Sequence, residues 1–262
     1  MNSETRVYEK INTVICRDAE EASDEVARQI IDLIRQRAEA GRPVVLGLAT
    51  GSTPVLLYQR LIRAHREEGL SFKHVLTFNL DEYFGLEREH PESYWRFMHT
   101  QLFDHIDIDP ENIHIPDGRV PREEVFEYCR RYEKRIEAAG GLEVQILGIG
   151  RTGHIGFNEP GSERESMTRL VTLDALTRKD AARNFKGEEA VPRYAITMGI
   201  DTILKARQIF LMGWGEAKAE VIAKAVEVEP NPALPASLLQ LHGNTTFYID
   251  RAASAELTRV KH

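Results

Sequence analysis

Hydrophobic residues recur along the chain in two alternating patterns, one with the period of a helix and one nearly continuous. The stretch EEASDEVARQIIDLIRQRAEAG places Val26, Ile30 and Ile34 on one helical face. Gly41 at its end suits the left-handed residue that terminates many helices. The apolar run PVVLGLA follows at residues 43–49 and is typical of a buried strand. This part of the chain therefore predicts a helix and then a strand.

A short polar turn joins that strand to a second helical pattern. The turn lies in LATGSTP, and the helical stretch TPVLLYQRLIRAHREEG begins within it. Pro54 suits the first helical position and Thr53 suits the N-cap. The pattern predicts a unit of strand, turn and helix.

The same alternation continues along the chain. Further strands are expected at HVLTFNL (74–80), EVQILGIG (143–150), YAITMGI (194–200), QIFLMGW (208–214) and TTFYID (245–250). Helical patterns lie between several of them, notably at 122–140 and 216–229. Such alternation predicts the α/β class, as a Rossmann-like three-layer sandwich with a mostly parallel central sheet. No low-complexity linker interrupts it, so a single domain over residues 1–262 is the simplest interpretation.

Composition and charge limit the kinds of partner that the protein is expected to bind. The 262 residues are 42% hydrophobic and 29% charged, which is ordinary for a globular protein with a sizeable core. A net charge of −7 argues against nucleic acid or an anionic membrane as the main partner, because both bind clustered Lys and Arg. No apolar stretch approaches the roughly 18 residues of a membrane span, and MNSETRVYEK lacks the apolar core of a signal peptide. We therefore expect a cytoplasmic protein.

The cysteines carry no sign of a metal or disulfide framework. Cys16 and Cys129 lie far apart, without a CxxC or a Cys/His ligand pattern. Two packed thiols are expected, and no metal site.

The residues that follow each expected strand carry the candidate chemistry. In open parallel sheets ligands bind beyond the carboxyl ends of the strands, where the strand order reverses. There the chain places TGSTP, then Asp81 and Glu82, then RTGHIGFNEP, and finally Lys218. A Gly, Ser and Thr turn at a helix start suits an anion. Because neither GxxxxGK[ST] nor GxGxxG occurs in that turn, a nucleotide is not specifically indicated.

Each of these features also has a purely structural interpretation. The turn can be a helix start alone, and Asp81 and Glu82 can be solvated acids. Burial and a neighbouring like charge would instead raise the pKa of Asp81 and suit it to transfer a proton. A lone histidine is most often structural, but Asn158 and Glu159 lie four and five residues after His154 in a Gly-rich segment. An acid/base histidine oriented by a carboxylate is then expected.

Several motifs in one order resemble the glucosamine-6-phosphate deaminase (isomerase) family over nearly the whole chain. They are LATGSTP, TFNLDEYFGL, HPESY, GIGRTGHIGFNEPGS, TRLVTL and VPRYAITMGI. The resemblance implies a metal-independent enzyme, without a cofactor, that converts glucosamine 6-phosphate and water to fructose 6-phosphate and ammonia. Two alternatives stay open. One is a 6-phosphogluconolactonase, which shares the fold and a GH-containing loop but hydrolyses an ester, and the other is a non-catalytic sugar-phosphate sensor.

The roles known in that family transfer to matching positions of this chain. The resemblance gives Asp81 the transfer of a proton between C2 and C1 of the open-chain sugar. It gives His154, supported by Glu159, the opening of the sugar ring by proton exchange with the ring oxygen. The positions that match the phosphate site are Gly51, Ser52, Thr53, Arg183 and Lys218. We expect these loops to converge on one sugar phosphate, with Asp81 within a ligand's length of Ser52 and Lys218.

One departure from the family concerns the catalytic group. Well-studied members read DGH where this chain has Thr152, Gly153 and His154. Thr152 can form a hydrogen bond but cannot stabilise an imidazolium by charge. With Thr152 in the aspartate's place, the expected outcomes are slower ring opening, action on a substrate that is already open, or a preference for the aminating direction.

Another set of positions concerns regulation. Some members of the family are activated by N-acetylglucosamine 6-phosphate at a site between subunits. Ser162, Arg169 and Thr172 match the positions that bind it, but Val171 stands where a lysine is expected. Loss of that ammonium predicts weak or absent activation. Relatives differ in oligomeric state, so a homo-oligomer stays open, and longer relatives leave open whether His262 is the natural C-terminus.

Aromatic residues near Asp81 suggest a cover over the pocket. Tyr83, Phe84 and the segment EREHPESYWRF (87–97) are candidates for a mobile loop of this kind. For Trp95 and Phe97 ordinary helix packing is expected instead.

Overall fold

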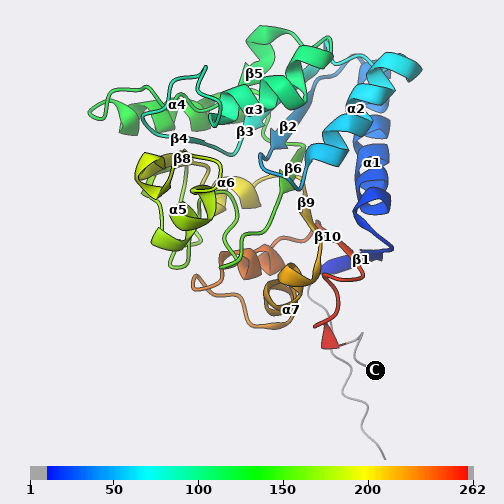
Figure 1. Ribbon diagram of the computed structural model, residues 1–262. Helices are drawn as coiled ribbons and strands as arrows, with labels where there is room; N and C mark the ends of the chain where they lie inside the picture. The colour runs from blue at the N-terminus through cyan, green and yellow to red at the C-terminus, as the bar shows by residue number, and fades with distance from the viewer. Residues whose placement is uncertain (1–10, 259–262) are drawn as a thin grey trace, which may run out of the picture.

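The computed structural model describes residues 11–258 (Figure 1). Residues 1–10 and 259–262 lie outside the described part, and with them lie the expectations for MNSETRVYEK and for His262. The assignment of the whole chain to a single domain stays a prediction.

Seven of the described strands form one sheet in which every neighbouring pair is parallel. Its order is β1-β10-β9-β6-β2-β3-β5. The strands are β1 (Asn12–Cys16), β2 (Val44–Leu48), β3 (Val75–Asn79), β5 (Ile113–His114), β6 (Val144–Leu147), β9 (Gln208–Gly213) and β10 (Thr245–Asp250). The central strands β2 and β6 are buried along their whole length, as near-continuous apolar runs require when both faces are covered. The predicted α/β class with a mostly parallel central sheet is confirmed.

Helices cover both faces of this sheet and complete three layers (Figure 1). The helices on one face are α1 (Ala19–Glu39), α2 (Val55–Glu68) and α3 (Tyr94–Gln101). Those on the other face are α4 (Val125–Ala138), α6 (Ile200–Leu204) and α7 (Ala219–Glu227). The remaining helical segments are α5 (Ala175–Ala181) and 3-10 turns at Phe103–His105, Pro110–Asn112, Glu188–Ala190, Glu216–Lys218 and Pro235–Leu241. Within residues 11–258, no helix combines the length and the apolar character needed to cross a lipid bilayer.

Three further strands form a separate antiparallel sheet in the order β4-β8-β7. They are β4 (Asp81–Tyr83), β8 (Tyr194–Thr197) and β7 (Arg169–Thr172). The run YAITMGI thus contains a strand as expected, but this strand lies outside the parallel sheet. Its apolar character reflects burial and says nothing about the direction of its neighbours, so the pattern could not distinguish the two sheets.

The start of α2 differs from the expected one. Pro54 takes the N-cap position with φ −83° and ψ 0°, and the helix begins at Val55. Among the described residues, no side chain caps this end. The N-cap prediction for Thr53 is wrong, because the helical backbone of Pro54 moves the cap one residue along the chain and leaves Thr53 in the turn.

The strand order reverses between β2 and β6. From β2 the chain continues outward to β3 and β5, whereas from β6 it continues the other way to β9 and β10. The loops at the carboxyl ends of β2 and β6 therefore leave in opposite directions and open a crevice between them. The segments that follow these strands begin at Ala49 and Gly148.

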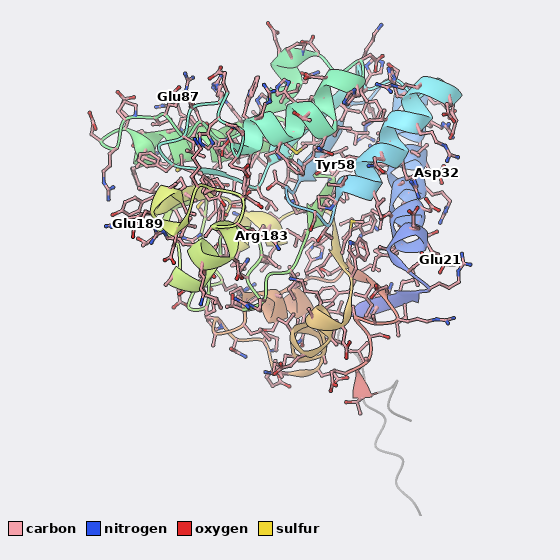
Figure 2. All side chains as sticks on the ribbon, viewed as in Figure 1. Glu21, Asp32, Tyr58, Glu87, Arg183 and Glu189 are labelled. Carbon is pink, nitrogen blue, oxygen red and sulfur yellow. The ribbon has the colours of Figure 1, made fainter. Side chains whose placement is uncertain are left out.

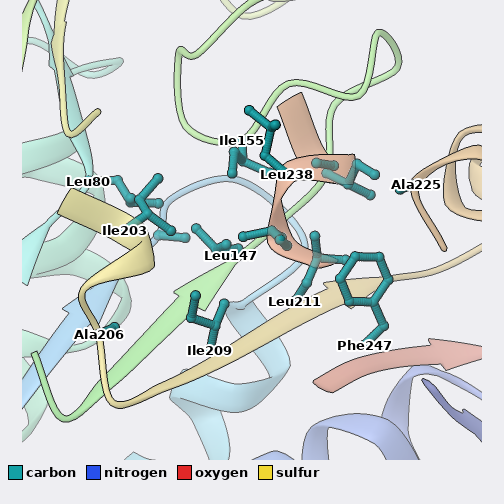
Figure 3. Packing of buried hydrophobic residues seen from close by; sticks show 14 of the residues in the cluster. Leu80, Leu147, Ile155, Ile203, Ala206, Ile209, Leu211, Ala225, Leu238 and Phe247 are labelled. Carbon is teal, nitrogen blue, oxygen red and sulfur yellow. The ribbon is translucent and has the colours of Figure 1, made fainter. Parts of the chain in front are cut away.

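The loops around this crevice are anchored in the core. Leu80, which precedes Asp81, and Ile155, which follows His154, belong to one buried cluster with Leu147 (Figure 3). Further along the same loop, Ser166 passes directly over Gly199. A Cβ added at Gly199 would lie only 2.0 Å from the backbone oxygen of Ser166. This close approach holds the loop against the start of α6.

Replacing Gly199 by alanine should therefore destabilise the fold. We expect Gly199→Ala to lower the free energy of unfolding by about 2 kcal/mol, because backbone must move to admit the methyl group. At Gly243 an added Cβ would meet no described atom within 4 Å, so Gly243→Ala is the matched control. Urea unfolding followed by circular dichroism measures both, and equal stabilities of the two variants would contradict the argument.

Candidate active site

A cavity of about 640 Å³ lies at the crevice. Its lining comes from the loops after β2, β3, β6 and β9 and from α5 with the segment after it. The sequence-predicted residues that line it are Gly51, Ser52, Thr53, Asp81, His154, Arg183 and Lys218. Thr152 and Glu159 are absent from the lining that the described residues form. They contact His154 at its Nδ1 atom. The expected convergence of distant loops on one cavity is thus observed.

One end of the cavity is shaped to receive an anion. Gly51 has φ 92°, which favours glycine, and it turns the chain from β2 toward the N-terminus of α2. Ser52 lies exposed beside it with its hydroxyl and backbone available. Because no side chain among residues 11–258 caps α2, its first N–H groups and the positive end of its dipole are open to a ligand.

Three cations, Arg151, Arg183 and Lys218, line the same cavity. Lys218 Nζ donates a hydrogen bond to the backbone oxygen of Ile149 at 2.7 Å. Burial lowers the pKa of Lys218, and the neighbouring Arg151 lowers it further while Asp180 opposes both. Arg183, which is labelled in Figure 2, is exposed and lies on the segment that follows α5. A bound phosphate would neutralise this cluster and favour the charged lysine.

Asp81 lines the same cavity and is almost fully buried. Its side chain makes no hydrogen bond or ion pair with any other described residue. A Cβ added at Gly156 would lie 3.2 Å from Asp81 Oδ2, so the carboxyl group lies against the loop that carries His154. Burial raises the pKa of Asp81 well above its usual range, and the charge of Glu82 raises it further. No positively charged side chain among the described residues compensates this buried acid.

Glu82 points away from the cavity and has a structural role. Its carboxylate accepts hydrogen bonds from the backbone N–H groups of Tyr83, Tyr94 and Trp95 at 2.8 to 3.0 Å. Two of these N–H groups belong to the first turn of α3, which the charge stabilises. Burial raises the pKa of Glu82 to about 7, although the three hydrogen bonds act in the other direction. The expectation that both acids would lie on one rim holds for Asp81 alone.

The His154 ring lies directly over the backbone of Gly150. A Cβ at Gly150 would be 2.0 Å from His154 Nε2, so only glycine leaves room for the ring. The other ring nitrogen, Nδ1, is 2.9 Å from Thr152 Oγ1 and 3.3 Å from Glu159 Oε2. The histidine is thereby held at Nδ1 and presents its Nε2 edge toward Gly150, which lines the cavity.

Glu159 is the charged partner of this histidine. Burial would raise the pKa of Glu159, but hydrogen bonds from His154, Thr177 and Thr152 outweigh burial, so the pKa lies below its usual value. Its side chain is 13% exposed. Glu159 therefore keeps a negative charge next to Nδ1, which favours a protonated nitrogen there.

Aromatic rings close one side of the cavity. Tyr83 lies 5.0 Å from Tyr94, 5.4 Å from Phe157 and 5.4 Å from Phe185, measured between ring centroids. Phe97 is half-buried against the core on the α1 and α2 face and also lines the cavity. The expected cover over the pocket stays a prediction. Helix packing, expected for Trp95 and Phe97, is confirmed for Phe97.

Several cavity residues were missed from the sequence. Arg151 lies in the loop after β6 and pairs with Asp180 at 2.8 Å. Thr177, Ala181 and Asn184 join Asp180 on the cavity face of α5 and the segment after it. Asp180, Ala181 and Asn184 lie three, four and seven residues after Thr177. This spacing is typical of one side of a helix and could have identified them from the sequence.

A second hollow of about 370 Å³ lies on the other side of Glu159. The four positions singled out for regulation all line it: Ser162, Arg169, Val171 and Thr172. Arg169 Nη1 donates to Asn158 Oδ1 at 2.9 Å, and Nη2 donates to Ser162 Oγ at 3.2 Å. The guanidinium is therefore engaged within the chain, and Val171 adds no charge to the hollow. Across the described part of the chain, no cluster of His, Cys, Asp and Glu side chains is arranged to hold a metal ion.

Known proteins are similar in sequence to this chain over most of its length. Residues 17–248 match the family model described as "Glucosamine-6-phosphate isomerases/6-phosphogluconolactonase". The glucosamine-6-phosphate deaminase of Shewanella woodyi is 50% identical over 236 residues, which are 90% of this chain and 89% of that protein. A putative glucosamine-6-phosphate deaminase-like protein of Bacteroides thetaiotaomicron is 46% identical over 253 residues, or 97% of this chain. This chain spans only 38% of the length of that Bacteroides protein.

Solved structures share the fold. A structure described as a monomeric glucosamine-6-phosphate deaminase matches with a TM-score of 0.89 and 43% identity, over 94% of this chain and 100% of that one. The 6-phosphogluconolactonase from Trypanosoma cruzi matches with a TM-score of 0.75 and 19% identity, over 95% of this chain and 97% of that one. The second likeness is one of fold alone.

The buried acids predict how stability depends on pH. Asp81 and Glu82 keep their protons to higher pH in the folded state than in the unfolded chain, so folding loses stability as pH rises through their folded-state pKa values. Asp81→Asn removes one of these ionisations. We expect this variant to gain stability over the unchanged chain near pH 8 and to gain little near pH 4.

Urea unfolding at both pH values measures this difference. The control is Asp32→Asn on α1, where the side chain is 60% exposed. It should show no pH-dependent gain. An Asp81→Asn gain of the same size at both pH values would contradict the assignment of a raised pKa.

Proposed function

This chain belongs to the family of glucosamine-6-phosphate isomerases and 6-phosphogluconolactonases, and we propose that it is a glucosamine-6-phosphate deaminase. It converts glucosamine 6-phosphate and water to fructose 6-phosphate and ammonia. The observation that carries the proposal is that Asp81, His154, Ser52 and Lys218 line one cavity. The names of relatives about 50% identical over most of their length support the same reaction.

The phosphate is bound away from the reacting carbons. The Gly51–Thr53 turn offers hydroxyls and N–H groups, while Lys218 and Arg183 offer charge. These contacts fix one end of the open-chain sugar, so that binding energy at the phosphate positions C1 and C2 beside Asp81.

His154 opens the sugar ring. A closed pyranose has no free aldehyde, so the ring oxygen must gain a proton as its bond to C1 breaks, while the C1 hydroxyl loses one. Nε2 is the nitrogen free to exchange that proton, because Nδ1 is held by Thr152 and Glu159. The Glu159 carboxylate lies 3.3 Å from Nδ1 and holds the ring in this orientation.

Asp81 moves a proton between C2 and C1. Among the described residues no cation pairs with Asp81, and burial raises its pKa, which disfavours the carboxylate in the free protein. The ammonium group on C2 of the substrate would supply the missing positive charge and favour the carboxylate. The carboxylate can then take the C2 proton while a proton of the ammonium group passes to the carbonyl oxygen on C1. Return of the first proton to C1 gives a hydroxyl at C1 and a protonated imine at C2. Water adds to that imine, and ammonia leaves as the ketone of fructose 6-phosphate forms.

Two other functions are weaker on these observations. A lactonase hydrolyses an ester and has no use for a buried acid over a carbon, and the likeness to lactonase structures is one of fold alone. A non-catalytic sensor would need the phosphate site but neither Asp81 nor His154. We include in the proposal a cytoplasmic location and a small sugar phosphate as the ligand.

The first test is the release of ammonia from glucosamine 6-phosphate. We expect the purified chain to release it, and Asp81→Asn to abolish exchange of solvent deuterium into the sugar carbon while binding of the sugar phosphate stays largely intact. Proton NMR measures exchange and calorimetry measures binding, with Asp32→Asn as an active control. Exchange at the native rate in Asp81→Asn would remove Asp81 as the base.

Two further results would remove the deaminase itself. Acid release from 6-phosphogluconolactone without ammonia release would favour the lactonase. Thermal stabilisation by sugar phosphates without turnover of either substrate would favour the sensor.

Regulation gives a separate prediction. We expect N-acetylglucosamine 6-phosphate to raise the rate of ammonia release weakly or not at all, because Val171 supplies no ammonium to the second hollow. The variant Val171→Lys restores that charge and should bind the effector more tightly in calorimetry. A clear rise in the rate of the unchanged chain with this effector would contradict the argument from Val171.

A further inference from the structure

Each carboxylate oxygen of Glu159 is held by the hydroxyl of a threonine. Thr177 Oγ1 donates to Oε1 at 2.5 Å, and Thr152 Oγ1 donates to Oε2 at 3.4 Å. The Thr152 hydroxyl also lies 2.9 Å from His154 Nδ1. A continuous set of contacts therefore runs from Thr177 through Glu159 and Thr152 to the histidine.

The shortest contact in this set comes from α5. Thr177 lines the cavity together with Asp180 and Ala181 of the same helix. Arg183, a cation of the proposed phosphate site, follows two residues after the end of the helix. The Thr177 hydroxyl thus connects the helix that leads to a phosphate cation with the group that holds His154.

No stronger interaction fixes the Glu159 carboxylate. Among residues 11–258, neither Arg nor Lys forms an ion pair with Glu159, and its charged contact is with His154 at 3.3 Å. A carboxylate with few partners can rotate about its side-chain torsions unless hydrogen bonds select one rotamer. A bond from a hydroxyl to an ionised carboxylate is short and strong enough to make that selection.

We propose that Thr177 is a positioning residue that orients His154 through Glu159, and this inference rests on the proposed deaminase function. The Thr177 hydroxyl holds Oε1 so that Oε2 faces Nδ1. Nδ1 then carries a proton, and Nε2 is left to exchange one with the sugar ring oxygen. The position of α5 sets the ring-opening histidine and the nearby phosphate cation at the same time.

The test compares two substitutions at one position. Thr177→Val keeps the shape of the side chain and removes the hydroxyl, whereas Thr177→Ser keeps the hydroxyl. We expect Thr177→Val to lower kcat for glucosamine 6-phosphate by roughly tenfold or more with little change in KM. Thr177→Ser should retain most of the activity. Thr100→Val, at an exposed threonine on α3, is the matched control and should be fully active.

A second measurement separates positioning from damage to the cavity. An acyclic amino-alditol 6-phosphate carries the same phosphate and amine but needs no ring opening. We expect all three variants to bind it as tightly as the unchanged chain does in calorimetry. Weaker binding by Thr177→Val would show that the loss comes from a displaced α5, and would overturn the positioning role.

The remaining outcomes are also distinct. An unchanged kcat in Thr177→Val, or equal losses in the Val and Ser variants, would overturn the inference while the deaminase function stands. An unchanged chain that releases no ammonia would overturn the proposed function, and this inference with it.

Discussion

The reversal of strand order between β2 and β6 is the constraint on which the rest of the structure depends. Two adjacent parallel strands lead their chains away in opposite directions, so no backbone fills the space beyond their carboxyl ends. The cavity of about 640 Å³ lies in that space. Its walls come from separate loops whose flanking residues, such as Leu80 and Ile155, are fixed in one core. Residues distant in sequence can therefore face each other across it in a rigid arrangement.

This arrangement leaves charges that the fold itself does not neutralise. Within the described part of the chain, Asp81 faces the cavity without a cation, while Lys218 is half-buried in the same cavity against a carbonyl oxygen. Both groups are disfavoured in their charged forms by burial. A ligand that carries both an amine and a phosphate would favour the charged forms of Asp81 and Lys218 at the same time. The free protein is less stable than it would be with apolar groups there, which is the usual relation between active sites and stability.

The sequence predicts the features that depend on neighbours along the chain. It does not predict which side of a short strand a side chain points to, or which tertiary contacts it makes. The runs in β2, β3 and β6 were recognisable because burial on both faces leaves an apolar pattern. The different roles of Asp81 and Glu82 were not recognisable from the sequence, because β4 has only three residues and was not recognised as a strand. Once β4 is known, alternation sends Asp81 to the cavity and Glu82 to α3. The contact between Thr177 and Glu159 joins α5 to the loop after β6 through tertiary packing, and no local pattern predicts it.

Thr152 contacts the His154 ring without adding a charge beside it. Its hydroxyl can accept a hydrogen bond from Nδ1 and donate one to Glu159. The negative charge next to the imidazolium then comes from Glu159 alone, at 3.3 Å. Asp81, which lies on a different strand, is unaffected by this substitution in its burial or its neighbours. Under the roles proposed for His154 and Asp81, the departure from the family bears on ring opening and not on the transfer of the proton between carbons.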